Sequence, residues 1–547
     1  MKPKLSLMLV FICSSVSLTA QKLSKEGTHE ISKKANKGYL YEPVIDEGKN
    51  ELTMTYVTKA TNKKAKFETY RFDLDFNFKG MEESEQPMEK VKGYKVDKGE
   101  EYTLNSLTVE TNFMGTLVLR RKIIKRKWNW FWGGYDSKIS LADKLKPKTD
   151  DGEKLFYFAH TEQDELESIL VIAGAKGPMT KDPMRQYKEI HVMRFDTEMN
   201  RIGDQTINFD TPQSIAGISS ADNDEDANAE DDILILFAPM GGKGMKNIAD
   251  PDPTNYTFVR LGYDGKIKER IAVKSKTGIF NGNMFVQTND GVLILGATGS
   301  DDDYYNEKFT TPQPASDARE GQNDEFKAKG FQVVKISNGK VDFVTNNTLD
   351  DFEAKAKSPA SQKKKPEYTG KKFRIADLKV SPNGDIFLTG QKYKKTNGPK
   401  LLGGSGGASI KYEDIIMMHF GSTGSLKAAY GVRREENDKE ASMSPNSQTL
   451  VFSNDGNKLY WMIMEMAGVK TERELGESKY KFLVYPSVSV IDINNAAIGE
   501  FAQFGQGKSD YYVNNKYPFL PIGKGQLVFL GENKSGKTLW FAKMPLE

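Results

Sequence analysis

The 547-residue chain has one cysteine and four histidines, and this scarcity limits its chemistry. Cys13 lies in an apolar N-terminal segment that we expect to be removed, which would leave the mature chain without a thiol. Disulfides, thiolate metal sites and a cysteine nucleophile are then excluded. Four histidines also provide little material for a metal site or a catalytic triad. We therefore expect no metal and no cofactor.

The chain also lacks an excess of charge of either sign and any long hydrophobic run beyond its N-terminus. Its 78 basic and 75 acidic residues leave a net charge of +3, which creates no global field for nucleic acid. No later segment approaches 18 uninterrupted apolar residues, so we expect no transmembrane segment. Aromatic residues make up 11% of the chain, and most of them are Phe and Tyr, which favours strands.

Residues 1–20 have the layout of a secretory signal peptide. Lys2 and Lys4 form a charged start, LSLMLVFICSSVSLTA follows as a short apolar core, and Ala20 ends a small-residue cleavage site. The residues before Cys13 match a lipoprotein acylation site poorly. We therefore expect an exported protein that resides in the periplasm, at the outer-membrane periphery or in the medium.

A turn followed by a strand recurs along the remainder of the chain. TNDGVLILGATG begins at Thr288, SPNGDIFLTGQK at Ser381 and SNDGNKLYWMIM at Ser453. Asn or Asp before Gly permits a tight turn, and the residues that follow suit a strand. A hairpin follows most of these pieces, which gives up to eight units. We expect the first inner strands of these units to begin near Leu52, Thr116, Ile169, Ile233, Val292, Asp385, Lys458 and Gln526.

Repeated four-stranded units of this kind are typical of a β-propeller. The turns in VSPNGDIFLTG (380–390) and FSNDGNKLYW (452–461) resemble the repeat of the Tol-system periplasmic propellers, and that resemblance implies a fold but no activity. We therefore predict an all-β chain in which residues 21–547 form a single propeller of seven or eight four-stranded blades. The alternative is an open pair of β-sandwiches.

Three insertions interrupt the predicted blades, near 221–232, 300–325 and 346–373, and their polar compositions favour solvated loops. Within the third, residues 347–357 predict a short helix capped by Asn346 or Thr348. The last unit lacks a strand, and we expect an early segment such as YLYEPVIDEG (39–48) to complete it, which would close the ring between the chain ends.

GENKSGKT (531–538) matches the P-loop expression, but an apolar strand follows it where a phosphate-binding helix is needed. We interpret residues 533–536 as a hairpin turn. His29, His160, His191 and His419 lie in separate segments without a nucleophile elbow or an H-E-x-x-H pair, so we expect structural roles for them.

Asp222, Asp224 and Asp226 alternate like the start of a calcium loop. Ala227 replaces the required glycine and Ile233 the bidentate glutamate, so these aspartates are weak calcium candidates and an exposed acidic turn is favoured.

RKWNWFWGG (126–134) is the segment that most suggests a binding site. In an extended chain Trp128, Trp130 and Trp132 would share one side, and Arg126 and Lys127 lie directly before them. Packing inside a blade is the first interpretation of the tryptophans. Because unpaired cations are costly to bury, we also expect a wet side that binds a sugar, a lipid headgroup layer or a partner.

The leading hypothesis from the sequence is therefore an exported β-propeller that acts as a binding or scaffold module for an envelope protein or a polymer such as a polysaccharide. The alternative is a carbohydrate-active enzyme that uses carboxylates at the central mouth of the propeller. The sequence does not specify an oligomeric state.

Overall fold

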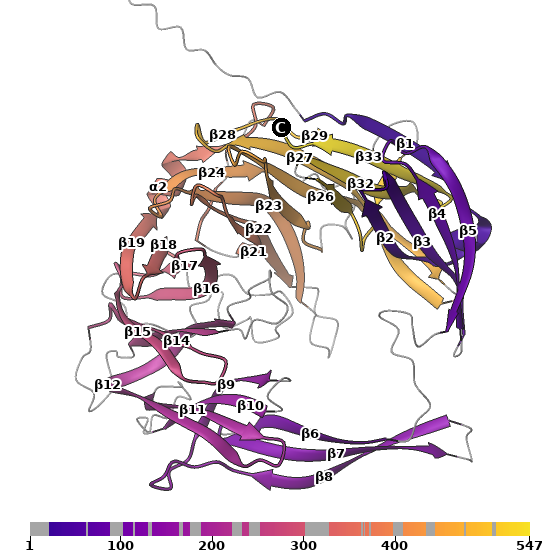
Figure 1. Cartoon of the computed structure of the whole chain (residues 1–547). Helices are drawn as coiled ribbons and strands as arrows, with labels where there is room; N and C mark the ends of the chain where they lie inside the picture. The colour runs from indigo at the N-terminus through magenta and orange to yellow at the C-terminus, as the bar shows by residue number, and fades with distance from the viewer. Residues whose placement is uncertain are drawn as a thin grey trace, which may run out of the picture.

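The computed structural model describes residues 21–61, 64–87, 102–112, 115–129, 134–163, 168–175, 187–220, 232–239, 252–300, 328–362, 365, 367–370, 373–397, 408–433, 444–474, 477–505, 510–523 and 525–547. Within these residues the chain consists of antiparallel β-sheets and two short helices, α1 (Lys33–Lys37) and α2 (Leu349–Ala354). The all-β prediction is confirmed for this part of the chain (Figure 1).

The strands form sheets in chain order. The first sheets contain β2 (Tyr39–Asp46), β3 (Glu51–Ala60), β4 (Lys64–Phe72) and β5 (Phe78–Pro87), then β6 (Tyr102–Thr111), β7 (Leu117–Asn129) and β8 (Gly134–Leu145). A seven-stranded sheet follows with β9 (Phe156–Gln163), β10 (Ser168–Ala175), β11 (Tyr187–Asp196), β12 (Arg201–Ser220), β13 (Ile233–Pro239), β14 (Asn255–Leu261) and β15 (Ile267–Lys274).

Four further sheets complete the described fold. They contain β16 (Phe280–Thr288), β17 (Gly291–Thr298), β18 (Gly330–Ser337) and β19 (Lys340–Thr348); then β20 (Ala356–Lys357), β21 (Phe373–Val380), β22 (Ile386–Asn397), β23 (Ala408–Phe420) and β24 (Leu426–Val432). The next contains β25 (Gln448–Phe452), β26 (Lys458–Glu474), β27 (Glu477–Asp492), β28 (Ala497–Ile498) and β29 (Ala502–Gln503). The last contains β30 (Tyr511–Val513), β31 (Phe519–Ile522), β32 (Gln526–Asn533), β33 (Thr538–Pro545) and β1 (Lys25–Glu30).

The eight predicted strand starts are confirmed, because each lies within one residue of the start of β3, β7, β10, β13, β17, β22, β26 or β32. These strands are not the first of their units, however. Another strand precedes each of them on the same sheet, for example β2 before β3 and β16 before β17. The preceding strands are shorter or more polar, so their signal in the sequence is weaker.

The seven-stranded sheet is two four-stranded units that share one long strand. The first half of β12 pairs with β11, where Ile207 lies opposite Ile190, and the second half pairs with β13, where Ile218 lies opposite Ile235. The strand passes from one unit to the next without a turn. The described sheets therefore contain eight repeating units, of which the β6–β8 unit has three described strands.

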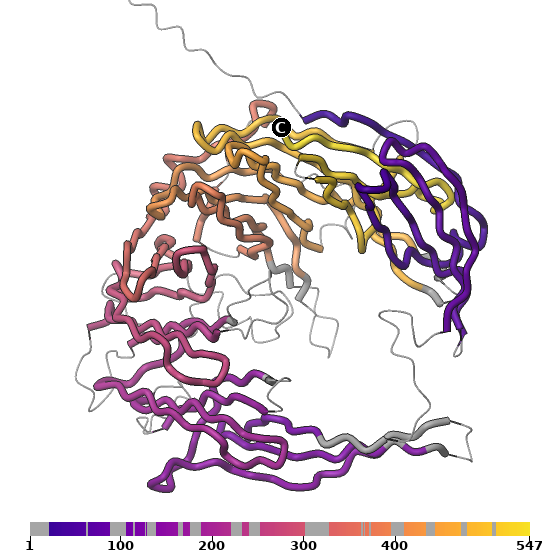
Figure 2. The backbone as a smooth tube through the Cα atoms, in the orientation of Figure 1, coloured from indigo at the N-terminus to yellow at the C-terminus, as the bar shows by residue number. Residues whose placement is uncertain are grey.

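From the β6–β8 sheet onward, each unit packs its face against the next through a hydrophobic cluster, and the last sheet packs in the same way against the β2–β5 sheet. One cluster joins β10 and β11 to β13 and β14, the next joins β13–β15 to β16–β18, and others continue through β22–β24 and β26–β27 to β32–β33 and on to β2–β4. Figure 2 shows the sheets following one another along an arc. The β2–β5 and β6–β8 sheets form its ends, and no cluster of described residues joins these two.

The N-terminal strand completes the C-terminal sheet. β1 pairs with β33 from Lys25 opposite Lys543 to Glu30 opposite Thr538. An early segment therefore completes the last unit as expected, but residues 39–48 are the wrong segment, because Tyr39–Asp46 forms β2 of the following sheet. The strand that closes the sheet contains no large apolar residue, and its backbone pairing positions it instead.

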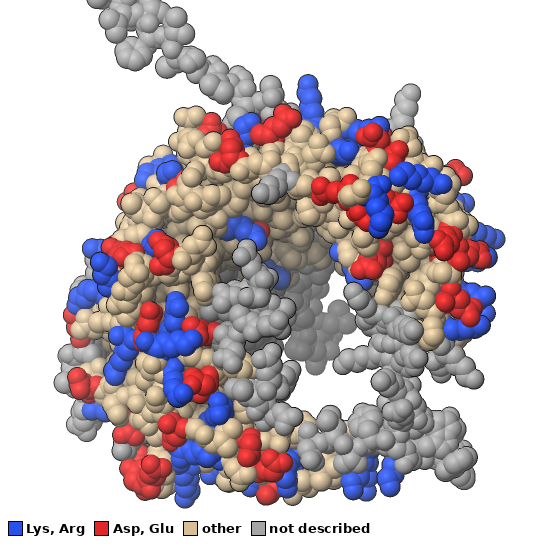
Figure 3. Space-filling model, viewed as in Figure 1, with Lys and Arg blue, Asp and Glu red and all other residues tan. Residues whose placement is uncertain are grey.

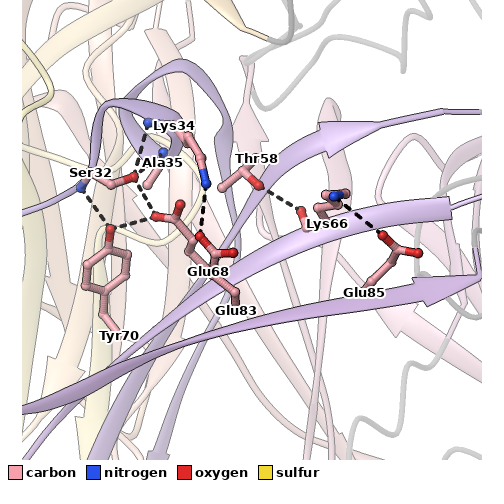
Figure 4. A network of polar contacts seen from close by, with 9 residues as sticks. All are labelled: Ser32, Lys34, Ala35, Thr58, Lys66, Glu68, Tyr70, Glu83 and Glu85. Carbon is pink, nitrogen blue, oxygen red and sulfur yellow. Dashed lines mark hydrogen bonds and ion pairs between the residues drawn. The ribbon is translucent and has the colours of Figure 1, made fainter.

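A polar cluster ties the segment after β1 to the β2–β5 sheet (Figure 4). Ser32 caps α1, because its Oγ accepts from the backbone N–H groups of Lys34 and Ala35. The same hydroxyl donates to the buried carboxylate of Glu68 at 2.6 Å, and Tyr70 Oη donates to that carboxylate at 2.8 Å. The helix cap thus satisfies a charge that would otherwise be costly to bury.

The predicted helix near residue 350 is confirmed as α2. Thr348 and Asp351 form a capping box at its start. Phe352 and Tyr368 are buried in the cluster between β17–β18 and β22–β24, and β20 pairs in parallel with β24. The expectation of a solvated loop is therefore wrong for this part of the 346–373 segment, because its aromatic side chains fill the core.

Candidate functional site

The predicted binding segment lies on the long hairpin of β7 and β8. Trp128 lies near the end of β7, where its Cα pairs with that of Tyr135. Arg126 pairs with Tyr102 and Ser137, and the side chain of Lys127 is exposed. Trp130 and Trp132 lie outside the described residues, as do Asp222, Asp224 and Asp226. The shared side of the three tryptophans stays a prediction.

The β6–β8 sheet has two unlike faces. On one face, Leu107, Leu117 and Leu119 are buried against β10 and β11. On the other face, two large apolar side chains of β8 are exposed to solvent. Ile139 is 63% exposed and Leu141 is 53% exposed. We refer to this second face as the open face of the β6–β8 sheet (Figure 1).

Charged side chains border these apolar residues. Glu110 Oε2 lies 2.8 Å from Arg120 Nε, and Glu110 Oε1 lies 3.0 Å from Lys122 Nζ. The hydrogen bond from Lys122 lowers the pKa of Glu110, and the charge of Arg120 adds to this effect. β7 carries positive charge only, because LVLRRKIIKRKWN contains six basic and no acidic residues. Successive side chains point to opposite sides of a strand, so the six charges follow β7 and are divided between its two faces.

The β2–β5 sheet at the other end of the arc also has a polar face. Thr53 and Thr55 on β3 are partly exposed, and the hydroxyls of Thr55 and Thr69 lie 3.2 Å apart. Arg71 Nη2 and Glu82 Oε2 form an exposed ion pair at 2.6 Å on the same sheet. Both ends of the arc therefore turn a polar surface away from the packed sheets.

His419 belongs to an enclosed network in the β21–β24 sheet. Its Nε2 lies 2.8 Å from Asp385 Oδ2, its Nδ1 lies 3.1 Å from Tyr430 Oη, and its ring stacks on Phe387. Lys427 Nζ donates to the same carboxylate at 2.6 Å. Burial lowers the pKa of His419, and the imidazole is completely shielded from solvent. This histidine therefore holds strands together and is not placed to meet a substrate.

Other sequence motifs do not assemble a reactive centre. Gly536 has a φ of 74°, and its N–H donates to Asn533 O at 2.8 Å, so the P-loop match is the turn between β32 and β33. The predicted hairpin turn is confirmed. Within the described ranges no group of three or more His, Cys, Asp or Glu side chains is arranged to hold a metal ion. No helix of the described chain is both long and apolar enough to cross a membrane.

Comparisons with known proteins give no family. No protein-family model matches the chain, and no curated protein matches it. Saccharomyces cerevisiae Sqt1 matches with 8% identity over 96% of this chain and 99% of that chain, at a TM-score of 0.25. Lignostilbene dioxygenase from Pseudomonas brassicacearum matches with 8% identity over 88% and 92% of the two chains, at a TM-score of 0.25.

A member of the DUF4221 family from Bacteroides vulgatus matches with 12% identity, covering 71% of this chain and 91% of that chain at a TM-score of 0.22. With TM-scores this low, the three likenesses identify neither a family nor an activity.

Proposed function

We propose that the chain is an exported β-propeller of eight units that serves as a binding or scaffold module in the cell envelope. Eight repeating units in chain order, clusters between successive sheets and completion of the last unit by β1 all support this architecture. The apolar, Lys-flanked segment at residues 1–20 supports export.

The β7–β8 hairpin carries the binding role. Its six cations follow β7 and are divided between the two faces of the hairpin, and Ile139 and Leu141 lie on β8 on the open face. Such a surface matches an extended, negatively charged polymer better than a compact protein, because the charges follow a line instead of enclosing a pocket. An acidic polysaccharide of the envelope is therefore the proposed ligand, and a protein partner is the alternative.

The charges of β7 are all positive, whereas those elsewhere on the visible surface are of mixed sign. Figure 3 shows basic and acidic side chains intermingled over the visible face, as expected for a chain with a net charge of +3. Generic attraction of a polyanion to the whole protein is therefore weak, and a matched control can separate it from binding at β7 and β8.

The test uses polygalacturonate as the probe and the mature chain as the protein. Replacing Lys125, Lys127 and Lys138 by Gln removes three exposed cations of the hairpin, and replacing Lys266, Lys340 and Lys379 by Gln removes three exposed cations elsewhere. We expect the first variant to bind about tenfold more weakly, since three surface charge contacts contribute on the order of 0.5 kcal/mol each. The control variant should bind like the original protein.

Equal weakening in both variants would contradict a site on the hairpin. The same experiment tests the alternative function, a carbohydrate-active enzyme with carboxylates at the central mouth. Cleavage of polygalacturonate into shorter chains would favour that enzyme. In a separate pull-down from solubilised envelope, an envelope protein that binds the original chain but not the hairpin variant would favour a protein partner.

A further inference from the structure

A small polar pocket lies between two neighbouring sheets, far along the chain from the β7–β8 hairpin. Its volume is about 240 Å³, and its polar lining comes from β21, β22 and the residues that lead into β25. The polar lining residues are Arg374, Gln391, Asn446, Ser447 and Gln448. A pocket of this size has room for a small polar molecule.

The side chains of Gln391 and Asn446 form one side of the pocket and are held by hydrogen bonds. Gln391 Oε1 accepts from Asn446 N at 2.9 Å, and Gln391 Nε2 donates to Glu413 O at 2.9 Å and to Asn446 Oδ1 at 3.1 Å. Asn446 Nδ2 donates in turn to Met464 O at 2.9 Å. Both residues are buried, so the pocket has a preformed shape.

Gln448 is different, because one end of its amide has no partner. The residue is 6% exposed, and its Oε1 accepts from Trp461 Nε1 at 3.2 Å and from the hydroxyl of Thr389. An indole N–H can only donate, so this oxygen must face Trp461. The opposite Nε2, with two N–H donors, makes no hydrogen bond in the protein. A buried donor without an acceptor is costly and calls for a ligand.

Arg374 adds a positive charge to the same lining. Its Nη1 donates to Tyr412 Oη at 2.9 Å, which fixes the guanidinium against a buried ring. Among the described residues, no carboxylate lies within ion-pair distance of this guanidinium. The pocket lining therefore contains a charged donor group and an amide side chain with an unused donor, and the side-chain oxygens of Gln391, Asn446 and Gln448 already accept hydrogen bonds.

We propose that this pocket binds the carboxylate of a small hydroxylated acid. Arg374 would donate a charge-assisted hydrogen bond to the carboxylate, Gln448 Nε2 would satisfy its unused donor on the same ligand, and the Ser447 hydroxyl would contact the ligand's hydroxyl groups. The inference does not depend on the polymer-binding surface, because the two sites share no residue and lie on different sheets.

The test measures binding of glucuronate to the mature chain by calorimetry, with glucose as the neutral counterpart. Gln448→Glu keeps an acceptor for Trp461 and replaces the unused donor by a carboxylate oxygen that repels the ligand. Arg374→Gln removes the cation. Lys379→Gln, on the same strand but outside the lining, removes an equal charge and serves as the control.

We expect glucuronate to bind and glucose to bind at least about tenfold more weakly. Gln448→Glu and Arg374→Gln should each lose at least about tenfold in glucuronate affinity, while Lys379→Gln and the Lys125, Lys127 and Lys138 variant retain it. Melting curves establish that each variant is folded. The proposal is overturned if the original protein does not bind glucuronate, if glucose binds equally well, or if folded Gln448→Glu binds glucuronate unchanged.

Discussion

Strands in the middle of the arc and strands at its ends differ in their burial pattern, as a comparison of the second strand of each unit shows. β10 and β13 are buried at every residue, and their sequences, SILVIAGA and ILILFAP, contain no charge. β3 reads ELTMTYVTKA, in which the buried Leu52, Met54 and Tyr56 alternate with partly exposed residues. A strand buried on both faces needs apolar residues throughout, whereas a strand with one wet face alternates.

This difference explains why the arc has two ends. The middle sheets have a dry neighbour on each side, and their hydrophobic clusters connect without interruption. A dry contact between the β2–β5 and β6–β8 sheets would instead bury Arg71, Arg120 and Lys122, at a cost that their ion pairs do not recover. The polar faces therefore require water or a polar ligand between them.

The largest expected loss of stability comes from Ala substitutions at neighbouring residues, compared between a strand buried on both faces (β13) and a strand with one exposed face (β3). Ile235 and Leu236 on β13 face different clusters, so replacing either by Ala should destabilise the protein by about 2–5 kcal/mol. On β3, Met54→Ala should cost a similar amount, but Thr55→Ala should cost less than about 0.5 kcal/mol. Denaturant unfolding measures all four. A large loss in Thr55→Ala would show that this face of the β2–β5 sheet is covered.

A second prediction concerns the buried network around His419 in the β21–β24 sheet. Burial lowers the pKa of His419, so the folded protein holds it neutral at a pH where the unfolded chain takes up a proton. Stability should therefore fall as the pH drops below about 6.5. Burial alone would raise the pKa of Asp385, but hydrogen bonds from His419 and Lys427 outweigh it and lower that pKa, so its contribution is lost only below about pH 4.

The measurement is the free energy of unfolding between pH 7 and 4.5 for the original protein and for His419→Gln. The variant should be less stable at pH 7, and its stability should depend less steeply on pH. Two parallel curves would mean that His419 titrates alike in the folded and unfolded states.

Much of the repeat could be predicted from the sequence, because turns such as SPNGD and the apolar strands after them carry a local signal. Gly384 adopts the positive φ that this turn requires, at 84°. β1 could not be predicted in the same way. KEGTHE contains no apolar pattern, and the strand exists because its backbone pairs with β33, more than 500 residues away.

The sites were harder to predict than the fold. The six cations of β7 are visible in the sequence, but Ile139 and Leu141 look like ordinary strand residues until the open face places them in water. The pocket lining joins Arg374, Gln391 and Gln448 from three separated segments, and amide side chains carry no motif. Only the packing of two sheets brings them together.

A third and smaller effect is expected at the junction between the last sheet and the β2–β5 sheet. Ser32→Ala removes the cap of α1 and one of the donors to Glu68, which should cost about 1–2 kcal/mol. Lys34→Ala removes only the exposed ion pair with Glu83, which water and salt screen, so it should lower the melting temperature much less than Ser32→Ala. Thermal melting of both variants separates the contribution of the Ser32 hydrogen bond to buried Glu68 from that of the exposed Lys34–Glu83 ion pair. Equal losses would contradict the role assigned to Ser32.

The smallest expected effect tests the open face itself. Ile139→Thr keeps a β-branched side chain on β8 and removes apolar surface that is already in water, so stability should change by less than about 0.5 kcal/mol. Leu119→Thr, on the opposite face of the same sheet, should cost several times more, because it places a hydroxyl in a closed cluster. If Ile139→Thr destabilises as strongly as Leu119→Thr, the face is covered in solution. The arc would then close at the β2–β5 and β6–β8 sheets, and a ligand at β7 and β8 would have to displace that contact before it could bind.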